Sequence, residues 1–361
     1  MKTKISIIGT VGVPACYGGF ESLVDNLLDF TPEDVEYTVF CSAKSYSQKL
    51  ESYKGAKIVY LDKDANGISS IFYDFECMKL AVKMHTDIML VLGVSGCIFL
   101  PFICKIFKGR IITNIDGLEW KRDKWKFYAK RLLHFSERQA VKYSDIVIGD
   151  NKGITDYVKD AYKKDAKLIA YGGDHVTKPE DDSLYEKYPF AKNPYAVTVC
   201  RIEPENNIHT ILDAFSNQNT TSLPIVIVGN WHKSEYVDNL KIKYNENKNI
   251  ILLDPIYEPH TINGIRSNAK VYIHGHSAGG TNPSLVEAMN IGLPIIAFDC
   301  VYNRATTNDK CLYWKDKEEL IKMITEKEDE FGVIAKDMLK IGKEWYSWEK
   351  IAKQYDALWR K

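Results

Sequence analysis

The sequence feature that most limits the fold is a regular alternation of short apolar runs with segments of helical periodicity along the 361 residues. The runs are rich in Val and Ile, as expected of parallel strands that are buried on both faces. Parallel strands need crossover connections, usually helices, so the alternation predicts an α/β fold with doubly wound parallel sheets. Ligands bind to such sheets beyond the carboxyl ends of the strands. The predicted strands lie at 4–10, 36–42, 58–61, 88–92, 110–115, 146–148 and 168–170 in a first series, and at 195–200, 225–228, 250–253, 271–273 and 295–298 in a second.

The two series of strands predict two domains of ordinary size. Residues 1–176 form the first domain, the polar and proline-containing residues 177–194 form a linker, and residues 195–344 form the second domain. Residues 345–361 are predicted to be a C-terminal helix with an aromatic-rich start. Hydrophobic residues make up 45% of the chain, which is enough to fill two cores.

Charge and cysteine usage exclude several classes of protein. Lys plus Arg equal Asp plus Glu at 48 each, which argues against a general nucleic-acid binder. The eight cysteines show no CxxC pair and no zinc spacing, so we expect buried free thiols in a reducing cytoplasm. The start of the chain has no signal-peptide pattern, and no apolar run approaches the roughly 20 residues of a membrane span. These observations predict a cytoplasmic protein without a nucleic-acid partner.

The loop after the fourth predicted strand of the second series has the pattern of an anion-binding helix N-terminus. Asn282 stands where an N-cap belongs, Pro283 suits the first helical position, and Gly292 ends the helix. The unpartnered N–H groups of a helix start, together with the helix dipole, favour a phosphate or diphosphate. The loop glycines Gly279 and Gly280 would let the backbone approach such a ligand closely.

Three side chains beside this loop can hold the rest of a nucleotide. Glu287 lies about one turn inside the helix, so its carboxylate can accept hydrogen bonds from a hydroxyl next to the phosphate, as a ribose offers. His274 and His276 flank the loop as neutral or cationic donors. The alternative is a tight strand-to-helix turn with a surface glutamate and two solvated histidines.

A second glycine-rich turn, residues 12–21, joins the first strand to the first helix. It contains Gly18 and Gly19 but does not spell the dinucleotide-binding GxGxxG pattern. We predict a second anion-facing helix start here. A turn that serves only packing is the alternative.

Two acidic residues, Asp116 and Glu119, follow the strand at 110–115, where ligands of a parallel sheet gather. They are candidates for polar contacts at a reaction centre, Asp116 first and Glu119 second. An acid pair at a helix N-terminus is the alternative.

The segment 120–131 mixes six basic residues with four aromatic ones. Basic and amphipathic aromatic side chains suit an anionic membrane surface or a polyprenyl-diphosphate head group. The apolar residues 97–107 are predicted to extend the same face. Ordinary amphipathic helices with snorkelling lysines are the alternative.

The stretch 274–294 resembles the C-terminal-domain signature of retaining, nucleotide-sugar-dependent glycosyltransferases of family 4. In the N-terminal half, Tyr17-Gly-Gly-Phe-Glu21 is similar to an element of the bacterial rhamnosyltransferase group, which carries a characteristic N-terminal domain of unknown function. The resemblance implies the GT-B architecture, in which two Rossmann-like domains face a cleft. It implies an acceptor-binding N-terminal domain, a nucleotide-sugar-binding C-terminal domain, and a final helix that crosses back to the N-terminal domain with Trp348 as its anchor.

The resemblance also assigns roles to single residues, with two departures. The family has two glutamates eight positions apart, the first touching the donor sugar and the second the ribose; Glu287 matches the second, but Gly279 stands at the first. Backbone amides around Gly280 and Thr281 are expected to replace the missing carboxylate. In the family's Arg-Leu-x-Pro-Glu-Lys-Asn element, the arginine and lysine neutralise the donor diphosphate. Arg201 and residues 202–207 match this element, except that Asn206 stands where the lysine is expected.

Two further positions are carried over from the family. Asp174 matches the aspartate of a turn at the interdomain cleft, and Asp116 takes the place of a histidine near the donor sugar. The predicted catalytic residues are Asp116, Glu119 and Arg201, and the predicted donor-binding residues are Gly18, Gly19, Asp174, Arg201, His274, His276, Gly279, Gly280, Thr281, Asn282, Ser284 and Glu287.

The resemblance implies transfer of rhamnose from dTDP-rhamnose, with retention, onto a polyprenyl-diphosphate-linked glycan in bacterial surface polysaccharide synthesis, such as capsule or O-antigen. The enzyme would be peripheral on the cytoplasmic face of the inner membrane. We expect no cofactor and no metal, because Arg201 and the two helix starts supply positive potential. Asp62-Lys-Asp64 imitates a metal-binding DxD but is predicted to be a surface loop. The alternatives are a nucleotide-sugar epimerase and a catalytically degenerate scaffold that binds glycans.

Overall fold

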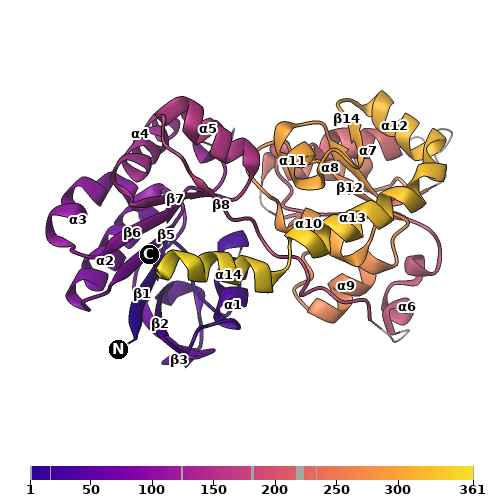
Figure 1. The fold of residues 1–361 in the computed structure, drawn as a ribbon. Coiled ribbons are helices and arrows are strands. Elements are labelled where there is room, and N and C mark those ends of the chain that lie inside the picture. The colour runs from indigo at the N-terminus through magenta and orange to yellow at the C-terminus, as the bar shows by residue number, and fades with distance from the viewer. Residues whose placement is uncertain are drawn as a thin grey trace. The chain divides into compact units, whose positions relative to one another are not determined.

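The computed structural model describes residues 2–16, 18–122, 125–179, 183–216, 223–232 and 234–360. The chain divides into two compact units, Met1–Tyr171 with Trp348–Lys361, and Gly172–Ser347. Each unit is built around one sheet with helices against it (Figure 1). The first unit ends earlier than the predicted boundary at residue 176, because the next residues pack against the second unit. There the Gly173 amide donates to the carbonyl of Tyr346 at 2.8 Å.

The first unit contains an eight-stranded sheet of order β3-β4-β2-β1-β5-β6-β7-β8. All neighbouring strands are parallel except β3 and β4, which form an antiparallel pair. The strands are β1 (Thr3–Ile8), β2 (Val35–Ser42), β3 (Ser52–Tyr53), β4 (Ala56–Leu61), β5 (Ile88–Leu92), β6 (Arg110–Asn114), β7 (Ile146–Gly149) and β8 (Lys167–Leu168). The helices are α1 (Gly19–Leu28), α2 (Ser69–Lys83), α3 (Leu100–Ile106), α4 (Phe127–Tyr143) and α5 (Lys152–Tyr162).

The second unit contains a six-stranded, wholly parallel sheet of order β11-β10-β9-β12-β13-β14. The strands are β9 (Ala196–Val199), β10 (Ile225–Val228), β11 (Ile250–Leu253), β12 (Val271–His274), β13 (Ile295–Phe298) and β14 (Leu312–Trp314). The helices are α6 (Ser183–Lys187), α7 (Ile208–Phe215), α8 (Glu235–Tyr244), α9 (Pro259–Ser267), α10 (Pro283–Ile291), α11 (Val301–Thr307), α12 (Lys317–Glu326) and α13 (Phe331–Trp345).

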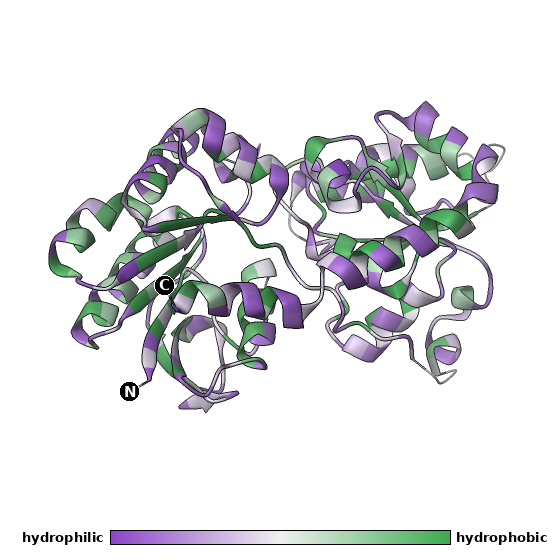
Figure 2. Cartoon of the chain, viewed as in Figure 1, coloured by the Kyte–Doolittle hydropathy of each residue, from purple (hydrophilic) through white to green (hydrophobic). Residues whose placement is uncertain are grey.

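The sheets form the centres of both cores. All four residues of β10 are buried, as are all five of β5, because helices cover both faces of each sheet. Figure 2 shows these strands in the hydrophobic colour, while the helices alternate between hydrophobic and hydrophilic faces. The α/β fold with two parallel-sheet, Rossmann-like domains is therefore as the alternation of strands and helices predicts.

The last helix, α14 (Trp348–Trp359), belongs to the first unit. The Trp359 indole N–H donates to the Tyr37 hydroxyl at 3.0 Å, and Asn114 donates to the Tyr355 hydroxyl at 3.2 Å. Trp348 begins the helix and is buried. The single helix predicted over 345–361 is wrong at its start, because Trp345 closes α13 and residues 346–347 separate the two helices.

Two other segments are more helical than the sequence suggests. The polar residues 303–307 are part of α11, in which Asn303 is buried and donates to the carbonyls of His276 and Phe298, both at 2.8 Å. The predicted linker at 177–194 contains α6 and a 3-10 helix, Pro189–Lys192, and its residues 180–182 lie outside the described part.

Candidate functional site

The second sheet has a topological switch point between β9 and β12. From β9 the chain continues to β10 and β11 on one side, whereas β12 leads to β13 and β14 on the other. At such a point the loops at the carboxyl ends of the two central strands part and leave a crevice in which ligands bind. The loop after β9 carries Arg201, and the loop after β12 carries residues 275–282.

Helix α10 begins as predicted. The Asn282 side chain accepts from the Ser284 amide at 3.0 Å, Pro283 occupies the first turn, and Gly292 closes the helix in the left-handed conformation with φ of 80°. The carbonyl of Asn282 accepts from the amides of Leu285 and Val286 at 3.0 and 3.3 Å. The first helical amides are therefore already satisfied, which corrects the prediction that they point outward without partners.

Backbone N–H groups without an acceptor among the described residues lie in the loop that precedes the helix. Within the described part of the chain, the amides of Gly279 and Gly280 have no hydrogen-bond acceptor, although both residues are buried. Gly279 has φ of 110°, a conformation that side chains other than glycine rarely adopt. Because buried amides are nearly always paired, two adjacent unpaired ones indicate a place for a ligand.

Glu287 does not stand alone at the surface. Its Oε2 lies 2.7 Å from Nη2 of Arg266, its Oε1 lies 3.4 Å from Nε2 of His175, and its side chain is only 15% exposed. Burial by itself would raise the pKa of Glu287, but the charge of Arg266 and a hydrogen bond from His175 hold that pKa below its usual value. The carboxylate is therefore ionised and held in place.

The sequence analysis singled out neither Arg266, which lies in no motif, nor His175, although His175 directly follows Asp174 in the turn that was singled out. The one local signal for Arg266 is that it is the basic residue in the last turn of α9. The neighbouring Asp174 is exposed, in the segment that leads to His175.

The two histidines of the loop are buried and not solvated, and one of them, His274, is neutral. Burial lowers the pKa of His274 to about 3, so its ring is neutral, and its Nε2 has no partner among the described residues. His276 is also buried, and its Nδ1 lies 2.8 Å from Oδ1 of Asn206. His274 therefore cannot supply the positive charge that the sequence analysis allowed for it.

Asn206 joins the two loops of the switch point. Its amide Nδ2 donates to the carbonyl of Arg201 at 2.7 Å while its Oδ1 faces His276. The amide and hydroxyl of Ser277 both donate to the carbonyl of Glu205 at 2.9 Å. Asn206 therefore has a structural role at the position where a lysine was expected.

The Arg201 side chain makes no close ion pair with the described residues. Its side chain is 47% exposed, and its nearest carboxylate is Oε2 of Glu203 at 3.7 Å. A guanidinium with such a loose partner is available to an anion, and its planar fork suits two phosphate oxygens at once.

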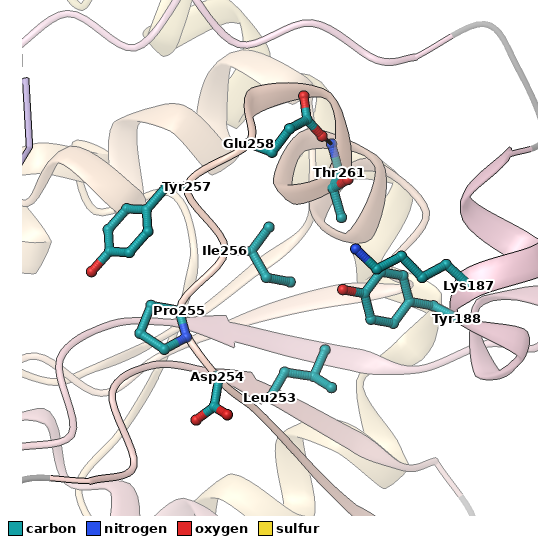
Figure 3. Close-up of a pocket in the computed structure, with 9 residues that line it drawn as sticks. All are labelled: Lys187, Tyr188, Leu253, Asp254, Pro255, Ile256, Tyr257, Glu258 and Thr261. Atoms are coloured by element: carbon teal, nitrogen blue, oxygen red, sulfur yellow. Dashed lines mark hydrogen bonds between the residues drawn. The ribbon is translucent and has the colours of Figure 1, made fainter. Parts of the chain in front are cut away.

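A cavity of about 360 Å³ lies further along the same unit, after β11. Ile256 and Tyr257 line it from the segment after β11, and Lys187, the last residue of α6, and Tyr188 line it from the other side (Figure 3). Glu258 caps α9 at the cavity, because its carboxylate accepts from the amides of His260 and Thr261 at 2.8 and 2.6 Å.

The candidate residues of the first unit form a separate set. The glycine-rich turn at Gly18 is organised by the buried Glu21, which accepts from the Thr10 hydroxyl, the Val11 amide and the Gly18 amide at 2.7, 2.7 and 2.8 Å. Gly18 thus donates within its own loop, while Gly19 begins α1.

Asp116 follows β6 with φ of 56°, and its amide donates to Oδ1 of Asn114 at 3.0 Å. Glu119 is engaged locally: one carboxylate oxygen lies 2.9 Å from Nε of Arg122, and the other accepts from the Trp125 indole at 2.9 Å. Glu119 begins a 3-10 helix, Glu119–Lys121, and its contact at a reaction centre stays a prediction.

No group of three or more potential metal ligands occurs among the described residues. Asp62 and Asp64 lie exposed in the bend after β4. None of the described helices is long and apolar enough to cross a membrane.

Comparisons with known proteins add to these observations. Residues 2–174 match the family model described as Domain of unknown function (DUF1972), and residues 181–324 match the one described as Glycosyl transferases group 1. No curated protein matches the sequence.

Solved structures share the fold over nearly the whole chain. A sucrose-phosphate synthase from Thermosynechococcus elongatus superposes with a TM-score of 0.82 at 16% identity, covering 99% of this chain and 98% of that one. Anabaena HepE in complex with UDP gives 0.77 at 14% identity, covering 99% of each chain. An Escherichia coli structure described as trehalose-6-phosphate bound with UDP-2-fluoro glucose gives 0.71 at 11% identity, covering 100% and 99%. The chain thus has the GT-B fold, and its second unit carries a glycosyl transferases group 1 domain, which makes the protein a glycosyltransferase.

Proposed function

We propose that the protein transfers rhamnose from dTDP-rhamnose, with retention of configuration, onto a hydroxyl of a polyprenyl-diphosphate-linked glycan during synthesis of a bacterial surface polysaccharide. The observation that carries the donor half of this proposal is the pair of buried, unpartnered amides of Gly279 and Gly280 at the switch point, with Arg201 on the adjoining loop. HepE was solved with UDP, with UDP-glucose, and with UDP and glucose, which supports a nucleotide-sugar donor for a chain of the same fold.

The donor would be held in three parts. The diphosphate accepts from the amides around Gly280 and Thr281 and from Arg201, because oriented backbone donors bind phosphate oxygens well. The pentose hydroxyl donates to Glu287, which is ionised. The base lies along residues 254–257, beside the cavity after β11.

The chemistry then needs stabilisation of the departing nucleoside diphosphate. As the bond between the sugar and the phosphate breaks, negative charge grows on the oxygens that face Arg201 and the loop amides, and preorganised donors stabilise this charge without a metal. An oxygen of the leaving phosphate takes the proton from the acceptor hydroxyl, which then attacks the same face of the sugar. Asp116 stays a predicted polar contact at the reaction centre, and Gly18 and Gly19 stay predicted donor-binding residues.

The acceptor proposal rests on the surface of α3 and α4 in the first unit. Every exposed charged residue within these two helices is basic, and the one acid of α4, Glu137, is buried. The exposed apolar residues of the two helices are Phe102, Ile106, Phe127, Tyr128, Leu132 and Phe135. Protruding aromatics among lysines and arginines suit the interface of an anionic membrane. Of the four aromatics in 120–131, Trp120 and Trp125 instead donate to Glu137 and Glu119, and residues 123–124 lie outside the described part.

Vesicle flotation tests this surface. Full-length protein should float with vesicles of phosphatidylglycerol and stay behind with phosphatidylcholine, and replacing Phe127 and Tyr128 by Ser should weaken flotation. The matched control is Ile242→Ser, since Ile242 is 85% exposed on α8 of the second unit. Equal flotation of all three proteins would contradict a role for α4.

The decisive test of function is incubation with a panel of nucleotide sugars and a polyprenyl-diphosphate-linked glycan, followed by mass spectrometry and NMR analysis of the linkage. We expect a rhamnosylated acceptor whose new bond keeps the anomeric configuration of the donor. Transfer of a different sugar would correct the donor, and an inverted product would contradict retention.

The two alternatives predict other outcomes. An epimerase would release an epimeric or free sugar and leave every acceptor unmodified. A degenerate scaffold would show no rise in melting temperature with any nucleoside diphosphate, whereas a ligand at a hundred times its Kd stabilises a protein by about 2.7 kcal/mol.

A further inference from the structure

The carboxylate of Glu287 is held by a residue outside every motif of the sequence, Arg266 on α9. The two groups belong to neighbouring helices, α9 and α10, and Nη2 of Arg266 lies 2.7 Å from Oε2 of Glu287. Arg266 is only 3% exposed, and its Nη1 donates weakly to Oδ1 of Asn263 at 3.4 Å. A charge-assisted bond of this length, between an arginine and a carboxylate, fixes both the position and the direction of the acceptor.

Stability alone does not account for this arginine. Removing a guanidinium and a carboxylate from water is expensive, and well-packed apolar residues often do as well or better at such positions. Moreover, Nε of Arg266 is buried without a hydrogen-bond partner among the described residues. An arginine that leaves a buried donor unsatisfied contributes little to folding stability. The effect of Arg266 on the Glu287 carboxylate accounts for it better.

Arg266 makes the two oxygens of the Glu287 carboxylate unequal. Oε2 is engaged by Arg266, whereas the partner of Oε1 among the described residues is Nε2 of His175, at the long distance of 3.4 Å. Oε1 is therefore the oxygen that can accept from a ligand, and the arginine bond stops the carboxylate from rotating away.

The helix that carries Arg266 also reaches the other end of the proposed nucleotide site. Its first turn is capped by Glu258, which lines the cavity after β11, and Arg266 lies in its last turn. One short helix thus connects the wall of the cavity to the acceptor oxygen of Glu287.

We propose that Arg266 is a positioning residue that presents Oε1 of Glu287 to a pentose hydroxyl of the bound nucleotide. This inference rests on the proposed function, because it assigns the residue that makes the sugar part of the nucleotide recognisable. It predicts a loss of affinity that depends on the pentose hydroxyls and not on the diphosphate.

The experiment measures Kd by calorimetry for UDP and dTDP, and for the 2′,3′-dideoxy analogue of whichever binds more tightly. In the wild type the analogue should bind about ten- to a hundredfold more weakly, the scale of a hydrogen bond to a charged group. In Arg266→Gln this discrimination should shrink to about threefold or less, with the affinity for the analogue itself nearly unchanged. Arg266→Lys, which keeps the charge but not the fork, should lie between the two.

Because Gln at position 266 leaves a buried carboxylate without its cation, the double variant Arg266→Met with Glu287→Gln keeps the test valid if the single variant does not fold. This double variant should discriminate between the nucleotide and its dideoxy analogue at least as well as the single variant Glu287→Gln does. Arg360→Gln removes an arginine from its pair with Asp34 in the first unit and serves as the matched control, with unchanged discrimination.

The outcomes separate the inference from the proposed function. A wild type that binds no nucleotide would overturn the proposed function. A wild type that binds, with Arg266→Gln and Arg266→Lys both keeping full discrimination, would overturn the role of Arg266. An equal loss of affinity for nucleotide and analogue would also overturn it, since a general disturbance of the site does not depend on the hydroxyls.

Discussion

The two glycine-rich turns of this protein look alike in sequence and differ in what they do with their donors. In the first unit, Glu21 sits inside the turn and accepts from Thr10, Val11 and Gly18. In the second unit, no carboxylate fills the loop after β12, and the described part of the chain offers the amides of Gly279 and Gly280 no acceptor. One turn carries its own anion, whereas the other is open to an external one. Glycine content alone therefore does not show which amides are available to an anion; their hydrogen bonds within the protein do.

The largest effect on activity is expected at Arg201. Its loop is connected to the open turn after β12 by the hydrogen bonds of Asn206 with Arg201 and His276. Arg201→Ala should lower the rate of sugar transfer about a hundredfold or more, the usual scale for removing a donor that stabilises developing charge. Steady-state kinetics with the donor that the panel identifies would measure the loss. An unchanged rate would remove Arg201 from the site.

The closed turn predicts a loss of stability instead. Glu21→Gln leaves one oxygen for three donors, two of them buried, and an unsatisfied buried donor costs about 1–3 kcal/mol. Thermal and urea unfolding should show a weaker first unit, while the Kd for UDP, which lacks the transferred sugar, should change less than about twofold. If affinity for UDP fell in parallel with stability, the two turns would share one role and the comparison would fail.

The buried titratable groups of the two units should respond to pH in opposite directions. Burial lowers the pKa of His274 in the second unit to about 3 and raises the pKa of Asp74 in the first unit to about 8. For His274 the folded pKa lies below the unfolded value. Its contribution to the free energy of unfolding is therefore complete above about pH 6.5 and is lost as the pH falls toward 3. For Asp74 the folded pKa lies above the unfolded value, so its contribution is complete below about pH 3.8 and is lost as the pH rises toward 8.

Urea denaturation of His274→Phe and Asp74→Asn beside the wild type would measure both effects. Between pH 5 and 6.5, the free energy of unfolding of the wild type relative to His274→Phe should rise by up to about 1.4 kcal/mol per pH unit. Between pH 6.5 and 8, relative to Asp74→Asn, it should fall at a similar rate. If these differences in the free energy of unfolding did not change with pH, the two groups would be solvated in solution.

The smallest predicted effect compares two helix caps of the same kind. Asn282 caps α10 beside the open turn, and Asn151 caps α5 in the first unit, where its side chain accepts from the Gly153 amide at 2.9 Å. Replacing either by Ala should lower stability by about 1 kcal/mol. Only Asn282→Ala should also weaken UDP or dTDP binding in calorimetry. Equal binding by both variants would separate the cap from the ligand site.

The predicted site was most accurate where a local rule applied. The N-cap at Asn282, the proline at position 283 and the left-handed Gly292 are all in place, because each follows from the conformational preference of one residue. For His274 and His276 the sequence left the alternative of solvated side chains open, since it does not show whether a histidine at a strand end points into solvent or into the core; both are buried. Arg266 could not be found at all, as its partner lies twenty-one positions away on another helix.

The sequence by itself determined the alternation of strands and helices, and therefore two parallel sheets with ligand sites at their carboxyl edges, because periodicity and turn chemistry act over a few residues. The strands predicted at 88–92 and 225–228, for example, are β5 and β10 with the same bounds. Only the tertiary structure decided which turn is filled by Glu21 and which is open, which histidine is neutral, and which arginine holds Glu287. These properties depend on burial and on partners far apart in the chain, which come together only when the strands are ordered in their sheets.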